Sequence, residues 1–208
     1  MKKTFYAVRI GRNPGIYESW LECEQQIKGF AGAMFKSFAT IEEAQAFMHG
    51  ISKEVDVKDM LEIYCDGSYA KERPEFATYG VVIVKNNEVI MKFNGVVDDH
   101  YNSNNITGEV FGVLKALKWV IKNNFKKIVI YHDYIGLSAW YDKSFTANTN
   151  IAKYYLENIN KLVKDNELHI NFIKVKGHSD NKWNDMADLL AKQALSKIDE
   201  YIAFKKQQ

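Results

Sequence analysis

Four acidic residues stand where a protein would place the ligands of a metal ion. Asp66 and Asp133 follow apolar runs typical of strands, and Glu109 and Asp188 fall in the first turns of segments with helical spacing. An acidic side chain near a core is costly unless a partner compensates its charge, and a bound cation is the usual partner. Carboxylates from separate elements are how proteins hold Mg²⁺, so these residues predict a magnesium centre.

The elements that must carry these residues follow one another along residues 60–208. Strands are expected over residues 61–65, 79–84, 88–93, 128–131 and 169–175, and helices over 106–123, 150–164 and 184–204. This order implies an α/β unit with a mixed five-stranded sheet and helices on both faces. If the first and fourth strands pair in parallel, Asp66 and Asp133 meet at the carboxyl edge of the sheet. Glu109 and Asp188 can face the same point from their helices.

A smaller α+β unit is expected over residues 1–49, joined to the larger unit by a short linker at 50–59. Its expected order is β-α-β-α: strands at 4–10 and 33–38, a turn at 11–15, and helices from Ser19 to about Lys28 and over 41–48. Glu22 and Glu43 stand three residues after Ser19 and Thr40, which predicts two capping boxes. Its expected core includes four aromatic residues: Phe5, Phe30, Phe38 and Phe47. Trp20 and Phe35 are candidates for the core or for an exposed stacking surface.

Composition limits the classes of protein that this chain can be. Its 208 residues are 47% hydrophobic, and 28 Lys and Arg face 26 Asp and Glu, so bulk charge does not indicate a nucleic-acid binder. Two cysteines, Cys23 and Cys65, are too few for a disulfide framework. Neither a leader nor a run of about 18 apolar residues is present. We expect a cytoplasmic protein that is monomeric and has no membrane partner.

The motifs around these acids resemble a known family. Residues 60 to about 196 resemble the catalytic domain of type 1 ribonuclease H, through Tyr64-Cys65-Asp66-Gly67-Ser68, Gly108-Glu109, the strand-end Asp133, Gly177-His178 and the segment Asn184 to Lys192. Residues 4–49 resemble its N-terminal hybrid-binding, or viroplasmin-like, module. The residues that carry this second resemblance are Tyr6-Ala7-Val8, Gly11-Arg12, Pro14-Gly15-Ile16-Tyr17, Trp20, Cys23 and Phe35-Lys36-Ser37-Phe38.

The first resemblance implies an endoribonuclease that hydrolyses the RNA strand of RNA–DNA hybrids. Two Mg²⁺ ions, or Mn²⁺ as the alternative, would be held by the four acids, with Asp66 bridging them. His178 would act in product release or proton handling. The resemblance also implies three residues that bind substrate beside the metals: Gly67, Ser68 and Asn105.

The second resemblance implies that the N-terminal module binds the hybrid or double-stranded RNA. Its binding residues would be Tyr6, Arg12, Trp20, Phe35 and Lys36, with rings stacking on the nucleic acid and cations on phosphate. The family motif usually has a second lysine where this chain has Ser37. Residues 140–150 also lack the basic protrusion of some family members, because Lys143 is the one basic residue there.

Each acid alone has a simpler interpretation. Asp66-Gly67-Ser68 can be a turn after a strand, and Glu109 an acid favoured by the helix dipole. Asp185 is the alternative to Asp188 on the closing helix. The rival functions are a DNA-cutting nuclease of the same superfamily and a non-catalytic binder of duplexes. A binder would lack one of the four acids and all four are present, so we favour the enzyme.

Overall fold

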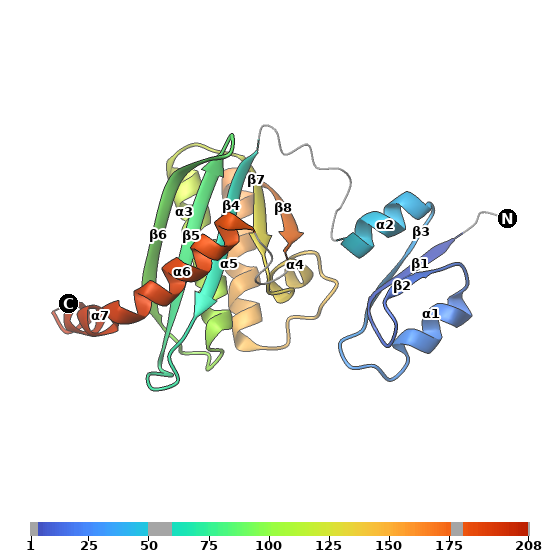
Figure 1. The fold of residues 1–208 in the computed structure, drawn as a ribbon, viewed down its shortest axis with the longest axis horizontal. Coiled ribbons are helices and arrows are strands. Elements are labelled where there is room, and N and C mark those ends of the chain that lie inside the picture. The colour runs from blue at the N-terminus through green and yellow to red at the C-terminus, as the bar shows by residue number, and fades with distance from the viewer. Residues whose placement is uncertain (1–3, 50–59, 176–180, 208) are drawn as a thin grey trace. The chain divides into compact units, whose positions relative to one another are not determined.

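The computed structural model describes residues 4–49, 60–175 and 181–207, which divide into two compact units, one centred on residues 4–49 and the other on the residues from 60 onward. Each unit has its own sheet (Figure 1). Within these ranges no helix combines the length and the apolar character needed to cross a membrane.

The first unit is a three-stranded antiparallel sheet with two helices. Its elements are β1 (Phe5–Ile10), β2 (Gly15–Tyr17), α1 (Trp20–Ile27), β3 (Met34–Phe38) and α2 (Ile41–His49). The strand order is β2-β1-β3, and both pairings are antiparallel. The expected β-α-β-α order was therefore wrong by one strand. β2 has three residues, too few for a periodic pattern, and it forms by pairing with β1.

Both helices of this unit begin as their capping residues predict. The Ser19 hydroxyl accepts a hydrogen bond from the Glu22 N–H, and the Thr40 hydroxyl accepts one from the Glu43 N–H. The Glu43 carboxylate in turn accepts from the backbone N–H of Ala39. These bonds satisfy N–H groups that have no partner within the helix itself.

The core of the first unit lies on both faces of its small sheet. Phe5, Ala7 and Ala44 form the cluster beneath α2, with Phe38 and Phe47 packed against it. On the other face the buried residues are Val8, Cys23 and Met34. The expectation of a buried Phe30 was wrong, since its side chain is 37% exposed. Phe30 lies between two turns, beyond the end of α1 and outside the sheet.

The second unit is built on a mixed five-stranded sheet. Its strands are β4 (Leu61–Ser68), β5 (Phe76–Lys85), β6 (Glu88–Asp98), β7 (Lys127–His132) and β8 (His169–Lys174), in the order β6-β5-β4-β7-β8. The pairs β4/β5 and β5/β6 are antiparallel, whereas β4/β7 and β7/β8 are parallel. The predicted fold class is confirmed, and so is the parallel pairing of its first and fourth strands.

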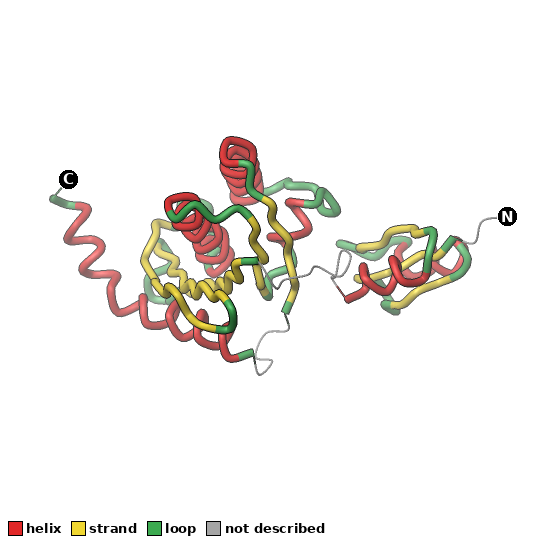
Figure 2. Tube along the Cα trace, turned by 90° about the horizontal axis from the view of Figure 1, so that it is seen from above, coloured by secondary structure: helices red, strands yellow, loops and turns green. Residues whose placement is uncertain are grey.

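Helices cover both faces of this sheet, as Figures 1 and 2 show. They are α3 (Asn105–Lys122), α4 (Gly136–Tyr141), α5 (Asn150–Asn166), α6 (Lys182–Ala194) and α7 (Ile198–Lys205). α3 packs on β4 and β5 from one side, with α5 against α3, and α6 packs on the same two strands from the other side.

The expectation of one unbroken closing helix was wrong. A 3-10 turn at Leu195–Lys197 separates α6 from α7. Ser196 donates its hydroxyl to the carbonyl oxygen of Gln193 at 2.9 Å, a side-chain bond that competes with regular helix pairing. The Tyr201 hydroxyl then anchors α7 by donating to the Asp98 carboxylate at the end of β6.

Three glycines let the helices lie directly on the sheet. A Cβ added to Gly67 in β4 would collide with the carbonyl oxygen of Asn105, and one added to Gly108 in α3 would collide with that of Thr78. A Cβ on Gly80 in β5 would collide with the carbonyl oxygen of Ala187 in α6. Any larger residue would push these backbones apart. The close approach carries the first turn of α3 and the middle of α6 to the end of β4.

Candidate active site

Three of the predicted acids converge at the carboxyl end of β4. Each of Asp66, Glu109 and Asp133 offers a carboxylate oxygen, and these three atoms all lie within 4.8 Å of one another. Parallel pairing of Tyr64 with Tyr131 places the ends of β4 and β7 side by side, which brings Asp66 near Asp133. Glu109, the fifth residue of α3, reaches the same point directly after Gly108, whose contacts hold that helix against the sheet.

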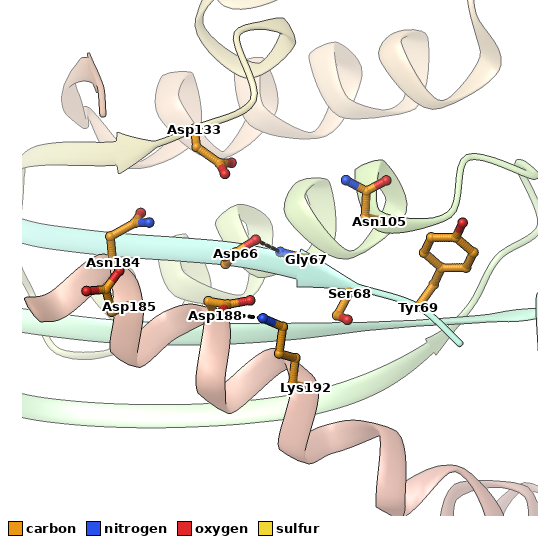
Figure 3. Close-up of a pocket in the computed structure, with 10 residues that line it drawn as sticks. All are labelled: Asp66, Gly67, Ser68, Tyr69, Asn105, Asp133, Asn184, Asp185, Asp188 and Lys192. Carbon is orange, nitrogen blue, oxygen red and sulfur yellow. Dashed lines mark hydrogen bonds and ion pairs between the residues drawn. The ribbon is translucent and has the colours of Figure 1, made fainter. Parts of the chain in front are cut away.

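Two of these carboxylates, Asp66 and Asp133, line an open hollow of about 400 Å³, whereas Glu109 is buried beside them. Ten residues line it: Asp66, Gly67, Ser68, Tyr69, Asn105, Asp133, Asn184, Asp185, Asp188 and Lys192. In Figure 3 the hollow lies between Asp133 on one side and the residues of α6 on the other, with Asp66 between them. Its lining is polar, and four of its ten residues are acids, so it suits a cation and a polar substrate.

The electrostatics of the cluster disfavour three bare carboxylates. Burial, followed by the charge of Asp133, raises the pKa of Asp66 to about 7, although the Gly67 N–H donates to its Oδ1 at 2.7 Å. Burial, followed by the charges of Asp66 and Asp133, raises the pKa of Glu109 well above its usual range. Buried like charges repel, and each prefers to be neutral unless a cation intervenes.

Glu109 provides the test of whether the site fits a metal ion. Its side chain is 1% exposed, and its Oε2 has no hydrogen-bond partner in the part of the chain that the structure describes. A buried carboxylate oxygen without a donor is costly. Oxygen ligands from several carboxylates are what hard divalent cations bind, so the donor set fits such an ion.

Asp188 lines the same hollow but is paired with a lysine. It is not one of the three acids that lie within mutual reach, and Lys192, one turn later on α6, donates to its Oδ2 at 2.6 Å. Asp185 also lines the hollow, from the first turn of the helix. The choice of Asp188 over Asp185 as a ligand therefore stays a prediction.

The remaining predicted residues of this unit divide into two groups. Gly67, Ser68 and Asn105 line the hollow, and Asn105 is the first residue of α3. Gly67 also has a structural task, because α3 rests on it. His178 and the loop at 176–180 lie outside the residues that the structure describes.

Three residues of the hollow were missed as site residues. They are Tyr69, Asn184 and Lys192. Asn184 is 3% exposed, and its Oδ1 has no hydrogen-bond partner among the residues described. Asn184 and Lys192 stand inside the motif that indicated Asp188, and the spacing of four residues from Asp188 to Lys192 was the available signal for an ion pair on a helix.

In the first unit, three of the predicted binding residues form one aromatic cluster. The Trp20 ring lies 5.7 Å from the Tyr6 ring and 5.7 Å from the Phe35 ring, measured between centroids. Trp20 is 45% exposed and Phe35 is 42% exposed, so these two rings are not core residues. Exposed neighbouring rings are rare without a partner and can stack on nucleic acid.

The two predicted cations of this unit are not both beside these rings. Lys36 pairs with Ala7 across the strands, whereas Phe35 pairs with Val8, so neighbouring side chains on β3 point to opposite faces. Lys36 instead places its Nζ 5.8 Å from the centroid of the Phe38 ring. Arg12 donates from Nη1 to the carbonyl oxygen of Gln25 at 2.9 Å, near the end of α1.

The fold and the site together define a class, that of α/β proteins whose mixed five-stranded sheet gathers acidic side chains able to bind a divalent cation. A family model described as RNase H matches residues 58–196, and one described as Ribonuclease H1 N-terminal domain matches residues 4–48. The chain belongs to the ribonuclease H family and carries this N-terminal domain. The family predicted from the sequence is therefore confirmed. The family is divalent-metal dependent, and the acidic group at Asp66 is one that could bind such an ion.

Some individual relatives match this chain over a short segment at high identity, and another matches over nearly its whole length at low identity. Ribonuclease H of Crithidia fasciculata is 52% identical over 48 residues, which are 23% of this chain and 10% of that protein. The first four curated relatives match over short segments, so the chain spans 10–17% of their length. Ribonuclease H1 of Homo sapiens is 24% identical over 261 residues, covering 94% of this chain and 91% of that protein.

A solved structure agrees in fold with the second unit. LC11-RNase H1, determined in complex with an RNA/DNA hybrid, has a TM-score of 0.54 and 14% sequence identity, covering 65% of this chain and 99% of that chain. At this identity the likeness is one of fold.

Proposed function

We propose that this chain is an endoribonuclease that hydrolyses the RNA strand of RNA–DNA hybrids. The observation that carries the proposal is the convergence of Asp66, Glu109 and Asp133 within 4.8 Å at an open hollow. The relative of the same fold that was solved with an RNA/DNA hybrid supports this class of substrate. A binding protein would have no use for buried acids that repel one another.

The proposed metal centre consists of Asp66, Glu109, Asp133 and Asp188, and it holds two Mg²⁺ ions or Mn²⁺ in their place. When bound, such a pair supplies Lewis acidity to the attacking water and to the leaving oxygen of an in-line displacement. In Figure 3 Asp66 stands between Asp133 and Asp188, so it would be the acid shared by the two ions. The Gly67 N–H fixes the orientation of the Asp66 carboxylate through its 2.7 Å bond to Oδ1.

The polar rim of the hollow would recognise the RNA strand. Ser68 and Tyr69 carry hydroxyls and Asn105 carries an amide, all on the wall formed by β4 and α3. These groups donate and accept hydrogen bonds, as a ribose 2′-hydroxyl does. The 2′-hydroxyl is the group that distinguishes RNA from DNA at a given site. We assign this recognition to Asn105 and Ser68, with His178 kept as the proposed aid to product release.

The N-terminal unit would hold the hybrid, or double-stranded RNA, by stacking. Its exposed rings, Trp20 and Phe35, are rigid and already in contact through the unit's own packing. Ser37 pairs with Tyr6 and so stands on the face of these rings, where the family motif usually has a lysine. The missing cation there reduces phosphate contacts, so binding by this unit rests more on stacking. Two contacts on one duplex would raise the local concentration of substrate at the catalytic unit of a monomer.

The test compares substrates and one matched pair of variants. Labelled RNA–DNA, RNA–RNA and DNA–DNA duplexes are incubated with the full chain and Mg²⁺, and we expect cleavage of the RNA strand of the hybrid alone. Asp66→Asn should abolish cleavage, whereas Asp165→Asn, which removes an exposed acid of α5, should not. Cleavage of DNA–DNA, or near-normal cleavage by Asp66→Asn, would overturn the proposal.

A further inference from the structure

We propose that Lys192 is a positioning residue of the metal centre. Its ammonium competes with a divalent cation for the Asp188 carboxylate and thereby lowers the affinity of the centre for that cation. The inference rests on the metal centre of the proposed function. It adds a residue that the sequence motif contained but to which no role was assigned.

The contact that carries it is short and lies within the hollow. The Lys192 Nζ donates to the Asp188 Oδ2 at 2.6 Å, and both residues line the cavity beside Asp66. In Figure 3 the Lys192 side chain extends from α6 toward Asp188, and its nitrogen points to the side where Asp66 lies. The ammonium therefore contacts one of the four acids and lies in the hollow that also holds Asp66.

This pair differs from an ordinary surface pair with the same helical spacing. In α1, Lys28 and Glu24 are 3.4 Å apart, and their side chains are 79% and 36% exposed. The Asp188 side chain is 25% exposed, and that of Lys192 53%. The hydrogen bond to Asp188, and also the charge of Asp66, raises the pKa of Lys192 above its ordinary value. Lys192 therefore experiences the field of the acid cluster as well as that of its partner.

Competition follows from the charges. An oxygen that accepts from an ammonium at 2.6 Å has less electron density to offer a cation, and the ammonium itself repels a divalent ion at short range. At the same time the ammonium offsets part of the repulsion among the acids. Lys192 should therefore make the ion-stripped protein more stable and its affinity for the ion lower.

Full-length protein is stripped of metal with EDTA and desalted. MnCl₂ is then titrated into it, and the affinity for Mn²⁺ is measured by isothermal titration calorimetry. Lys192→Met removes the ammonium and keeps the stem, and Lys192→Arg keeps a cation. Lys164→Met removes the same charge from the exposed last turn of α5 and controls for net charge. The thermal unfolding midpoint of each stripped protein is measured in parallel.

We expect Lys192→Met to bind Mn²⁺ about three- to tenfold more tightly than the wild type, a range set by short-range repulsion in a partly solvated site. Its ion-stripped form should unfold at a lower temperature. Lys192→Arg and Lys164→Met should both bind as the wild type does. A pair that merely stabilises α6 would lower the midpoint and leave Mn²⁺ affinity unchanged.

Unchanged or weaker Mn²⁺ binding by Lys192→Met would overturn the inference while leaving the metal centre intact. Equal tightening in Lys164→Met would also overturn it, because net charge would then be the cause. A wild-type protein that takes up no Mn²⁺ would overturn the proposed metal centre itself, a result recognisable before any variant is made.

Discussion

The Asp66 carboxylate should destabilise this protein at neutral pH whenever divalent ions are withheld. Burial and the charge of Asp133 raise its pKa to about 7, against an ordinary value of 3.8. The pKa of Asp66 is higher in the folded state than in the unfolded state, so the folded state holds the proton more tightly. The contribution of this group to stability is therefore fully present below about pH 4, where the carboxyl group is protonated. That stability is lost as the pH rises toward and through 7.

The size of the effect follows from the two values. The difference between about 7 and 3.8, converted at about 1.4 kcal/mol per pH unit, is on the order of 4 kcal/mol and is an upper bound. Asp66→Asn keeps the shape of the side chain and cannot ionise. With EDTA present, its free energy of unfolding should exceed that of the wild type by a few kcal/mol at pH 8 and by little at pH 4.

The assay is urea unfolding followed by circular dichroism, for both proteins at several pH values. Saturating Mg²⁺ should reverse the order at pH 8, because an ion that binds only the native wild type adds to its stability. Asp185→Asn is the matched control: it lines the same hollow, and its loss should cost about 0.3–1 kcal/mol through the helix dipole. If Asp66→Asn does not raise the free energy of unfolding in EDTA, or raises it equally at pH 4 and pH 8, then the Asp66 charge does not destabilise the fold.

Three further predictions concern single residues. Asp188→Asn should lower the rate of hybrid cleavage at least about tenfold more than Asp185→Asn. Asp188 is the proposed metal ligand, and removing even a residue that orients a ligand typically costs about 10- to 100-fold in activity. Trp20→Ala should weaken hybrid binding by about 1–3 kcal/mol with little change in the salt slope, measured by anisotropy across a salt series, because stacking carries little charge. Gly108→Ala should lower the free energy of unfolding by about 1–3 kcal/mol, whereas Gly112→Ala, whose nearest contact would be 3.4 Å, should not.

Each of these has an outcome that would contradict it. A dead Asp185→Asn beside an active Asp188→Asn would mean that the wrong acid of α6 was chosen. Phe30→Ala removes another exposed ring outside the aromatic cluster, and an affinity loss equal to that of Trp20→Ala would deny the cluster any special role. Equal stabilities for the two glycine variants would show that α3 can move away from β4 without cost.

Local features were predictable because their causes lie within a few residues. Ser19 and Thr40 form the capping bonds that their spacing from a glutamate predicts. Asn86 and Asn87 both adopt positive φ, at 52° and 62°, in the tight turn between β5 and β6, and asparagine is a residue type that tolerates this conformation. The sequence also allowed the prediction that Phe35 and Lys36 point to opposite faces of the sheet, because side chains alternate along any strand.

Features that depend on a partner distant in the sequence were not predictable in the same way. β2 exists because β1 lies beside it, and α7, which follows the break at Leu195–Lys197, is held by the bond from Tyr201 to Asp98 at the end of β6. Phe30 carries an aromatic ring that any hydrophobicity pattern places inside, yet no element of the sheet covers it. Such outcomes are decided by which surfaces meet.

The amino-acid sequence already contains the chemistry available to this protein, because it shows which residues are acids and that two accompany strands and two accompany helices. It also placed Lys192 four residues after Asp188. The meeting of three of the acids at one point is visible in the folded structure alone, because it requires β4 to pair with β7 and Gly67 to admit α3. The folded structure also shows Asp188 held by Lys192 rather than gathered with the others. Distances of a few ångströms between elements far apart in the chain are set by packing, which no local pattern contains.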